Sequence, residues 1–352
     1  MINLATKRRK HKRRKVSSLG KLCILLLIIL IIVFSVSNCI MNKRKSNNSN
    51  YEYNASGSLT GEIMEYIAAN NKPKYATRND TTKALDIESE YGILIDIEND
   101  VILGDKNGDK KIYPASLTKV MTLIVAVENI KDFDRTFTFT NELIDPLVQE
   151  EASRAGFDPY ETVTLNDLLY GTVLPSGADA TVGLAEYVCG GEDEFVKLMN
   201  KKVNELGLKN THFMNTSGLH DEYHYSTAHE MALILEYAMK NKKCAEVLST
   251  YTYTTSKTTE HPDGIELYST MFSRMYGDEA EGVKIVSGKT GYTTEGGNCL
   301  ASYAEDKNGK GYILVTTNAK GSYTPIYDAI NAYADFIGTG EVTIKQEVVE
   351  TY

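Results

Sequence analysis

Residues 114–129 read PASLTKVMTLIVAVEN, and no other stretch of the chain says as much about its fold. Apolar residues recur in it at a spacing close to 3.6, at Leu117, Met121, Ile124 and Val125. This spacing predicts a buried helix from residue 116 to residue 129, beginning just after Pro114. Because such a helix must be covered by other elements, the flanking segments are expected to supply them.

Strand patterns lie both before and after this helix. Residues 91–97 and 101–103 are β-favouring runs separated by a turn, which predicts a hairpin. Further helices are predicted at 165–170, 179–188, 192–206, 228–239 and 325–337. Three more strands are predicted at 283–287, 299–304 and 311–317. The pattern predicts an α/β fold: one antiparallel sheet with strands from both ends of the chain, flanked by helices, plus a mostly helical subdomain.

Charge is distributed very unevenly along the 352 residues. Twelve lysines and arginines precede the first acidic residue, Glu52, which leaves 26 basic and 47 acidic residues beyond them. Residues 46–352 therefore carry a formal net charge of −21. A body this acidic repels phosphates, so we expect no nucleic-acid partner.

The N-terminal region has the pattern of a membrane anchor. Residues 22–41 carry no formal charge and are rich in Leu, Ile and Val. As a helix, this segment is long enough to cross a bilayer core of about 30 Å. The basic cluster before them predicts a cytoplasmic tail over 1–21 and an extracytoplasmic body, so the predicted location is the cell membrane with a single pass. A cleaved signal peptide is the rival interpretation, although 35–38 offer no small-residue cleavage site. A lipoprotein attached through Cys39 is a weaker rival.

Beyond the span, the chain divides into three parts. Residues 42–84 are predicted to be a spacer and lead-in, because the segment up to residue 60 is polar and poor in aliphatic side chains. Residues 85–338 are predicted to form the folded domain. Residues 339–352 are predicted to be a C-terminal tail.

Three short motifs carry chemistry. A serine three positions before a lysine on a helix places the hydroxyl and the amine on the same face, and Ser116 and Lys119 have this spacing in SLTK. The helix N-terminus is expected to lower the pKa of the lysine. Ser176, in LPSGADA, lies in a predicted turn where a second hydroxyl can relay a proton. Lys289 and Thr290, in SGKTGYT, can present a charge and a donor to a carboxylate, and the following glycine lets the backbone approach closely.

Together these motifs resemble the active site of penicillin-binding proteins and β-lactamases. Residues from about 85 to 338 are similar throughout to the D-alanyl-D-alanine carboxypeptidase family. The similarity is clearest in PASLTKVMT (114–122), GLKNTHFMNTSGLH (207–220), YSTAHEMAL (225–233) and SGKTGYT (287–293). The resemblance implies a β-lactamase/transpeptidase-like fold.

The resemblance also implies a role for each motif residue. Ser116 is the acylated nucleophile, Lys119 its general base and Ser176 a proton relay. Lys289, Thr290 and Gly291 form the substrate-binding strand, in which the first two hold the terminal carboxylate. The backbone N–H groups of Ser116 and Tyr292 form the oxyanion hole. No metal and no other cofactor is implied.

Two departures from the family pattern stand out. Ala178 occupies the third position of the second motif, where the family usually has asparagine, so an amide that holds the substrate backbone is missing. We expect weakened or retuned activity from this change. Family members often carry a basic residue after the strand that follows the third motif, and here Lys320 is the available one.

Other polar residues are given structural interpretations. Four histidines, at positions 212, 220, 224 and 229, lack the spacing of a zinc site and are predicted to be solvated loop residues. Glu161 precedes Ser176, so it is predicted to lie in a helix-cap region and not to activate a deacylating water.

The implied activity is removal of the terminal D-alanine from peptidoglycan stem peptides ending in D-Ala-D-Ala, with β-lactam antibiotics as covalent inhibitors. A D-Ala-D-Ala endopeptidase shares all three motifs and stays the nearest alternative. A β-lactamase and a catalytically weak peptidoglycan-binding protein are further alternatives. The first lacks an evident base for deacylation after Ser176, and the second would be expected to lose Ser116 or Lys119.

Overall fold

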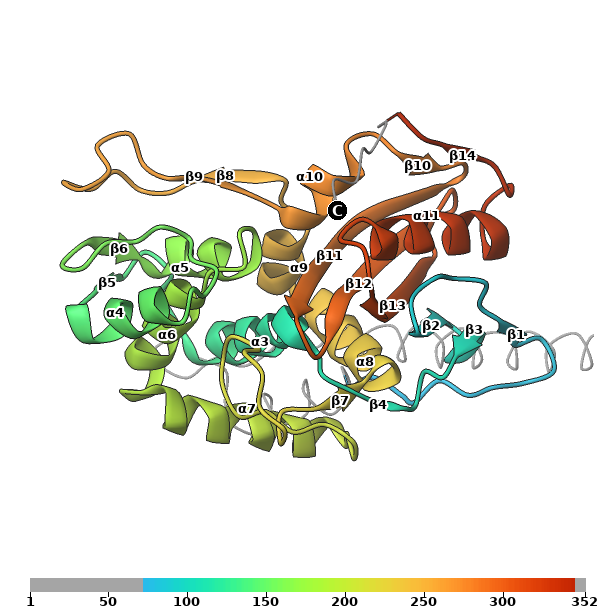
Figure 1. The fold of residues 1–352 in the computed structure, drawn as a ribbon, viewed down its shortest axis with the longest axis horizontal. Coiled ribbons are helices and arrows are strands. Elements are labelled where there is room, and N and C mark those ends of the chain that lie inside the picture. Colours follow the sequence, from blue (N-terminus) through green and yellow to red (C-terminus); the bar gives the residue numbers. More distant parts are fainter. Residues whose placement is uncertain (1–71, 346–352) are drawn as a thin grey trace, which may run out of the picture. The chain divides into compact units, whose positions relative to one another are not determined.

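The computed structural model describes residues 72–345 (Figure 1). The predicted cytoplasmic tail, the predicted membrane span and most of the spacer lie outside these residues. In the part of the chain that is described, no helix is both long and apolar enough to cross a membrane. The span predicted over residues 22–41 therefore stays a prediction.

An eight-stranded sheet forms the centre of the molecule, in the order β1-β3-β2-β13-β12-β11-β10-β14. Its strands are β1 (Lys83–Ala84), β2 (Tyr91–Asp96), β3 (Val101–Lys106), β10 (Glu279–Ala280), β11 (Val283–Thr293), β12 (Gly297–Asp306), β13 (Gly311–Ala319) and β14 (Val342–Thr343). Because β2 pairs with β13, segments more than 200 residues apart become neighbours. The predicted antiparallel sheet with strands from both ends of the chain is confirmed. The short pair of β1 and β3 at one edge is parallel, which differs from the prediction of a purely antiparallel sheet.

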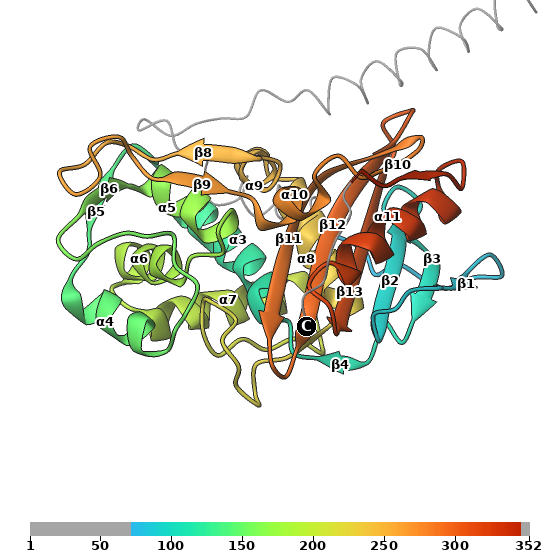
Figure 2. The same cartoon turned by 45° about the horizontal axis from the view of Figure 1, so that its top comes forward.

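Alternate residues of each strand point to opposite faces of the sheet and enter separate cores. Ile93 belongs to one core and its neighbour Leu94 to the other. Helix α11 (Thr324–Phe336) packs on β12 and β13 from one side (Figure 2). There the fully buried Tyr333 accepts a hydrogen bond from the Leu314 amide of the sheet. Helix α8 (Ala228–Met239) covers the opposite face. The sheet is therefore enclosed on both sides.

A mostly helical region lies beside the sheet (Figure 1). Its helices are α3 (Lys119–Asn129), α4 (Asn141–Gln149), α5 (Leu165–Val173), α6 (Ala178–Cys189), α7 (Glu192–Leu206) and α9 (Lys242–Leu248). Three two-stranded sheets accompany these helices: β4 (Lys111–Ile112) with β7 (Ser226–Thr227), β5 (Thr136–Thr138) with β6 (Thr162–Thr164), and β8 (Thr252–Thr254) with β9 (Glu266–Tyr268). The short helix α10 (Thr270–Met275) follows β9. The first eight residues of α3 are all buried, so this helix is a central element of the core.

The start of the first predicted helix differs from the expectation. Ala115–Thr118 form a 3-10 turn, η1, and α3 begins only at Lys119. Ala115 has a φ of +48°, a left-handed value that a regular α-helix does not contain. Ser116 therefore lies at a sharp corner just before the helix.

The packed body extends beyond both predicted boundaries. Ala76 is 5% exposed and belongs to the core, and the Thr77 amide donates to the Asp100 carbonyl at 2.9 Å. At the other end, β14 adds an edge strand to the sheet after residue 338. Packed residues are therefore present before residue 85 and after residue 338.

Candidate active site

The candidate nucleophile and its base meet at the junction of η1 and α3. The Lys119 ammonium nitrogen lies 3.1 Å from the Ser116 hydroxyl oxygen and donates to the Ser217 carbonyl at 2.6 Å. Lys119 is only 2% exposed, whereas Ser116 is half-buried and reachable from solvent. The amine can therefore take the hydroxyl proton of a serine that a substrate can approach.

Burial lowers the pKa of Lys119 to about 7. The carboxylates of Asp179 and Glu192 act in the opposite direction and raise it. The expected lowering is present, but its leading cause is loss of solvation in the interior and not the helix N-terminus. A lysine with this pKa is neutral for part of the time near neutral pH, as a general base must be.

A loop about 100 residues away in the sequence holds the lysine in place. The Thr122 hydroxyl donates to the Thr216 carbonyl at 2.7 Å, and Glu192 accepts from the Thr216 amide at 2.8 Å. Gly218, with a φ of +85°, lies so close that a Cβ there would be 1.9 Å from the Ala115 carbonyl oxygen. The sequence showed this segment only as part of the family resemblance, and its contact with Lys119 was not predicted.

The second motif lies where it was predicted, in the turn between α5 and α6. Ser176 has a φ of +66° and is 8% exposed. In residues 72–345 its hydroxyl has no hydrogen-bond partner, so it bonds to neither Ser116 nor Lys119. Its hydroxyl is therefore free to bond to a bound substrate.

The neighbouring residues of this motif shape the loop before β6. Asp179 is fully buried and accepts hydrogen bonds from the amides of Ala155, Gly156 and Phe157 at 2.8 to 3.2 Å. Ala178, the position of the missing amide, is 2% exposed. The turn is thus built around the aspartate.

The third motif lies on β11, in contact with η1. Lys289 is 1% exposed and donates to the Thr290 carbonyl at 2.8 Å, while the Thr290 hydroxyl lies 2.5 Å from that of Thr270. A Cβ on Gly291 would come within 2.9 Å of the Ser116 amide nitrogen, so the strand backbone passes beside the nucleophile. Tyr292 follows with an exposed side chain.

Burial also lowers the pKa of Lys289, and here the neighbouring charges add to the effect. The ammonium of Lys119 and the guanidinium of Arg274 both disfavour a third positive charge. Lys289 therefore occupies a place that favours an incoming anion.

Two of the four histidines are buried, so their interpretation as solvated loop residues is wrong. His224 is 2% exposed and His229 4% exposed. Nδ1 of His224 accepts from the Met214 amide at 3.2 Å, so Nε2 carries the proton and donates to the Thr118 hydroxyl at 2.7 Å. Burial lowers the pKa of His224 to about 3, which keeps it neutral beside the catalytic turn.

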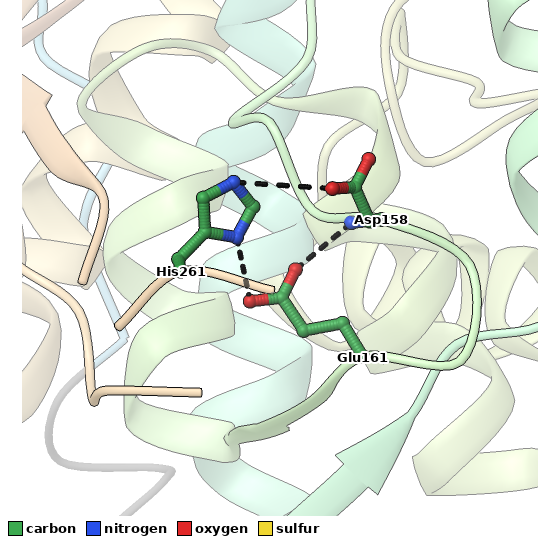
Figure 3. A group of neighbouring side chains, drawn as sticks. All are labelled: Asp158, Glu161 and His261. Carbon is green, nitrogen blue, oxygen red and sulfur yellow. Dashed lines mark hydrogen bonds and ion pairs between the residues drawn. The ribbon is translucent and has the colours of Figure 1, made fainter. Parts of the chain in front are cut away.

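The helix-cap interpretation of Glu161 is also wrong, because Thr164 and Asp167 form the capping box of α5. Figure 3 shows His261 between two carboxylates, with Nδ1 2.9 Å from Glu161 and Nε2 3.9 Å from Asp158. In residues 72–345 this is the one group of three that could hold a cation. Both oxygens of Glu161 already accept protein hydrogen bonds, so the group links the loop before β6 to the β8–β9 hairpin.

The fold is that of penicillin-recognising DD-peptidases. The crystal structure of the Streptomyces K15 DD-transpeptidase matches with a TM-score of 0.63 and 28% sequence identity, over 70% of this chain and 96% of that one. Residues 77–321 match the family model described as D-alanyl-D-alanine carboxypeptidase, peptidase S11. The chain belongs to this family.

Two curated relatives show the range of the family. D-alanyl-D-alanine carboxypeptidase DacF of Bacillus subtilis (strain 168) is 32% identical over 234 residues, which cover 66% of this chain and 58% of that protein. A D-alanyl-D-alanine endopeptidase of Pseudomonas aeruginosa is 26% identical over 276 residues, which cover 76% of this chain and 83% of that one. The match thus spans under two thirds of the length of the Bacillus relative.

Proposed function

We propose that the protein is a serine-type D-alanyl-D-alanine carboxypeptidase that removes the terminal D-alanine from peptidoglycan stem peptides. The observation that carries the proposal is the 3.1 Å contact between the Ser116 hydroxyl and the buried amine of Lys119. The family membership of residues 77–321 supports the same substrate class.

The proposed reaction proceeds through an acyl-enzyme. Neutral Lys119 takes the proton of the Ser116 hydroxyl as its oxygen attacks the carbonyl carbon between the two D-alanines. Backbone N–H groups of Ser116 and Tyr292 stabilise the oxyanion. Ser176 donates its hydroxyl proton to the leaving amine and receives the proton held by Lys119, and free D-alanine departs. Water then hydrolyses the ester, and its proton returns the serine hydroxyl to its starting state.

We expect the missing amide at Ala178 to weaken substrate positioning without abolishing activity. Loss of one neutral hydrogen bond costs about 0.5 to 1.5 kcal/mol, or up to about tenfold in rate. Lys289 and Thr290 are proposed to hold the terminal carboxylate of the substrate, and β-lactams to acylate Ser116 in its place.

The proposal includes attachment to the cell membrane through residues 22–41, with the domain on the extracytoplasmic side. The uncharged run and the basic residues before it support this orientation. Protease added to intact cells lacking their wall should digest the domain and spare the N-terminal tail. Protection of the domain until the membrane is opened would contradict the orientation.

The experiment that tests the activity uses the full-length chain in detergent, with Ser116→Ala as control. Intact mass is measured after incubation with penicillin, and D-alanine release from a pentapeptide is followed in parallel. An adduct absent from the variant, together with D-alanine release, supports the carboxypeptidase. An adduct without release favours the endopeptidase, which the similarity to the Pseudomonas protein keeps as the second candidate. No adduct at all would exclude Ser116 as the nucleophile.

A further inference from the structure

Helix α10 brings a basic residue to the active site that the three motifs do not contain. Arg274 lies four residues after Thr270, on the same side of this short helix, and the Thr270 hydroxyl contacts that of Thr290 in the third motif. The guanidinium is therefore held beside the strand that carries Lys289.

Arg274 is half-buried, yet its contacts with the described residues, 72–345, leave most of its hydrogen-bonding capacity unused. One guanidinium nitrogen, Nη1, donates to the Ser322 carbonyl at 3.4 Å, out of five N–H groups in all. None of the ion pairs between residues 72 and 345 includes Arg274 or Lys289. Two neighbouring cations without an acidic partner are unfavourable in a protein interior unless an anion joins them.

A cavity gives such an anion access to the guanidinium. It has a volume of about 360 Å³ and is lined by Pro175, Thr270, Ser273 and Arg274, together with residues 266–268. Pro175 directly precedes Ser176, so the cavity opens beside the second motif. Glu266, the acidic residue in this wall, is exposed and forms no ion pair with Arg274.

We propose that Arg274 is the second cationic anchor, beside Lys289, for the terminal carboxylate of the substrate. The proposal rests on the carboxypeptidase function proposed above. Lys320, the basic residue that the sequence offers for this task, has an exposed side chain. The guanidinium of Arg274 reaches the same β13–α11 loop from α10. A planar guanidinium can bind a carboxylate through two parallel hydrogen bonds, which a lysine cannot do.

The test compares ligands that differ only in the carboxylate. Acylation of the full-length chain by penicillin and by penicillin methyl ester is followed by intact mass, for the wild-type protein and for Arg274→Gln, Arg274→Lys and Lys320→Gln. D-alanine release from a pentapeptide is measured for each. Thermal unfolding midpoints show whether each variant is folded.

For Arg274→Gln we expect penicillin acylation and D-alanine release to fall about ten- to a hundredfold, the size expected for a lost charge-assisted hydrogen bond. Acylation by the methyl ester should change little. Arg274→Lys should recover part of the loss, and Lys320→Gln should behave as wild type.

Three results would overturn the anchor. These are an equal loss with both ligands, no loss with either, or a loss that follows Lys320 in place of Arg274. If the wild-type protein releases D-alanine and Arg274→Gln still prefers penicillin to its methyl ester, the anchor is excluded but the carboxypeptidase function stands. If the wild-type protein is neither acylated nor active, both proposals are excluded.

Discussion

The helical and the sheet sides of the active site each contribute a lysine, and the two lysines are equally buried but lie in opposite electrostatic surroundings. Lys119 is 2% exposed and Lys289 is 1% exposed. Near Lys119, the carboxylates of Asp179 and Glu192 offset part of the cost of burial. Near Lys289, the neighbouring charges are those of Lys119 and Arg274, which add to that cost.

The difference assigns different chemistry to two identical side chains. The balance around Lys119 leaves its pKa near 7, where an amine can both accept and return a proton. The imbalance around Lys289 is relieved when a carboxylate binds. On the first side, the backbone beside the reactive groups has a positive φ at Ala115 and Ser176. On the sheet side, Lys289 lies in the stretch of β11 that pairs with β12 without a register shift, from Ser287 to Thr293.

Exchange of each lysine for methionine tests this comparison most directly and gives the largest expected effect. Lys119→Met should slow acylation about 10²- to 10⁴-fold because the general base is lost. Lys289→Met should act mainly on KM, by about ten- to a hundredfold, because it removes a charged hydrogen bond to the substrate. Stopped-flow acylation and steady-state kinetics separate the two. Lys284→Met, an exposed position on the same strand, is the matched control. Equal effects of both exchanges on kcat would contradict the division of labour.

Gly218→Ala should damage the helical side by moving the catalytic turn. The new Cβ would lie 1.9 Å from the Ala115 carbonyl, on a residue whose φ is +85°. Gly309→Ala is the control, since its φ is +80° and nothing lies within 4 Å. We expect the control to lose about 1 to 2 kcal/mol from backbone strain alone. Gly218→Ala should lose more stability and nearly all acylation in thermal melts and mass measurements. Similar losses at both positions would show that the contact with Ala115 is unimportant.

Asp179→Asn should shift the pH dependence of acylation. Protonation of Lys119 removes the base, so acylation should fall as the pH drops through about 7. Asp179 raises the pKa of Lys119, so loss of its charge should move this acidic limb to lower pH. The limb is read from acylation rates between pH 5 and pH 9. Glu246→Gln, at an acid that pairs with Lys243 and is not one of the carboxylates that raise the pKa of Lys119, should leave it in place. A shift to higher pH for Asp179→Asn would contradict the electrostatic account.

The smallest expected effect is that of Ala178→Asn, which restores the amide usual in the family. D-alanine release should rise by up to about tenfold through one added hydrogen bond to the substrate. Because Ala178 is 2% exposed, the larger side chain could also overpack the turn, so the unfolding midpoint is measured alongside. Ala178→Ser, which adds bulk without an amide, is the control. An equal gain from serine would rule out the amide as its source.

The sequence by itself determined the architecture and the reactive groups. Apolar periodicity located the helices at 192–206 and 228–239 and the strands on both ends of the chain, because the period of burial is a local property of each element. The spacing of Ser116 and Lys119 gave their contact, since residues three positions apart at a helix start share a face.

Only the tertiary structure decided what surrounds those groups. The carbonyl that receives the Lys119 hydrogen bond is 98 residues away, at Ser217. His224 lies in a loop rich in polar residues and His229 near the start of α8, and only the packing of distant elements shows that both are buried. Arg274 lies beside the strand of the third motif through the contact of α10 with β11, which no spacing in the sequence reveals. Burial and charge environment depend on segments brought together by folding, and these two properties set the pKa values on which the proposed reaction depends.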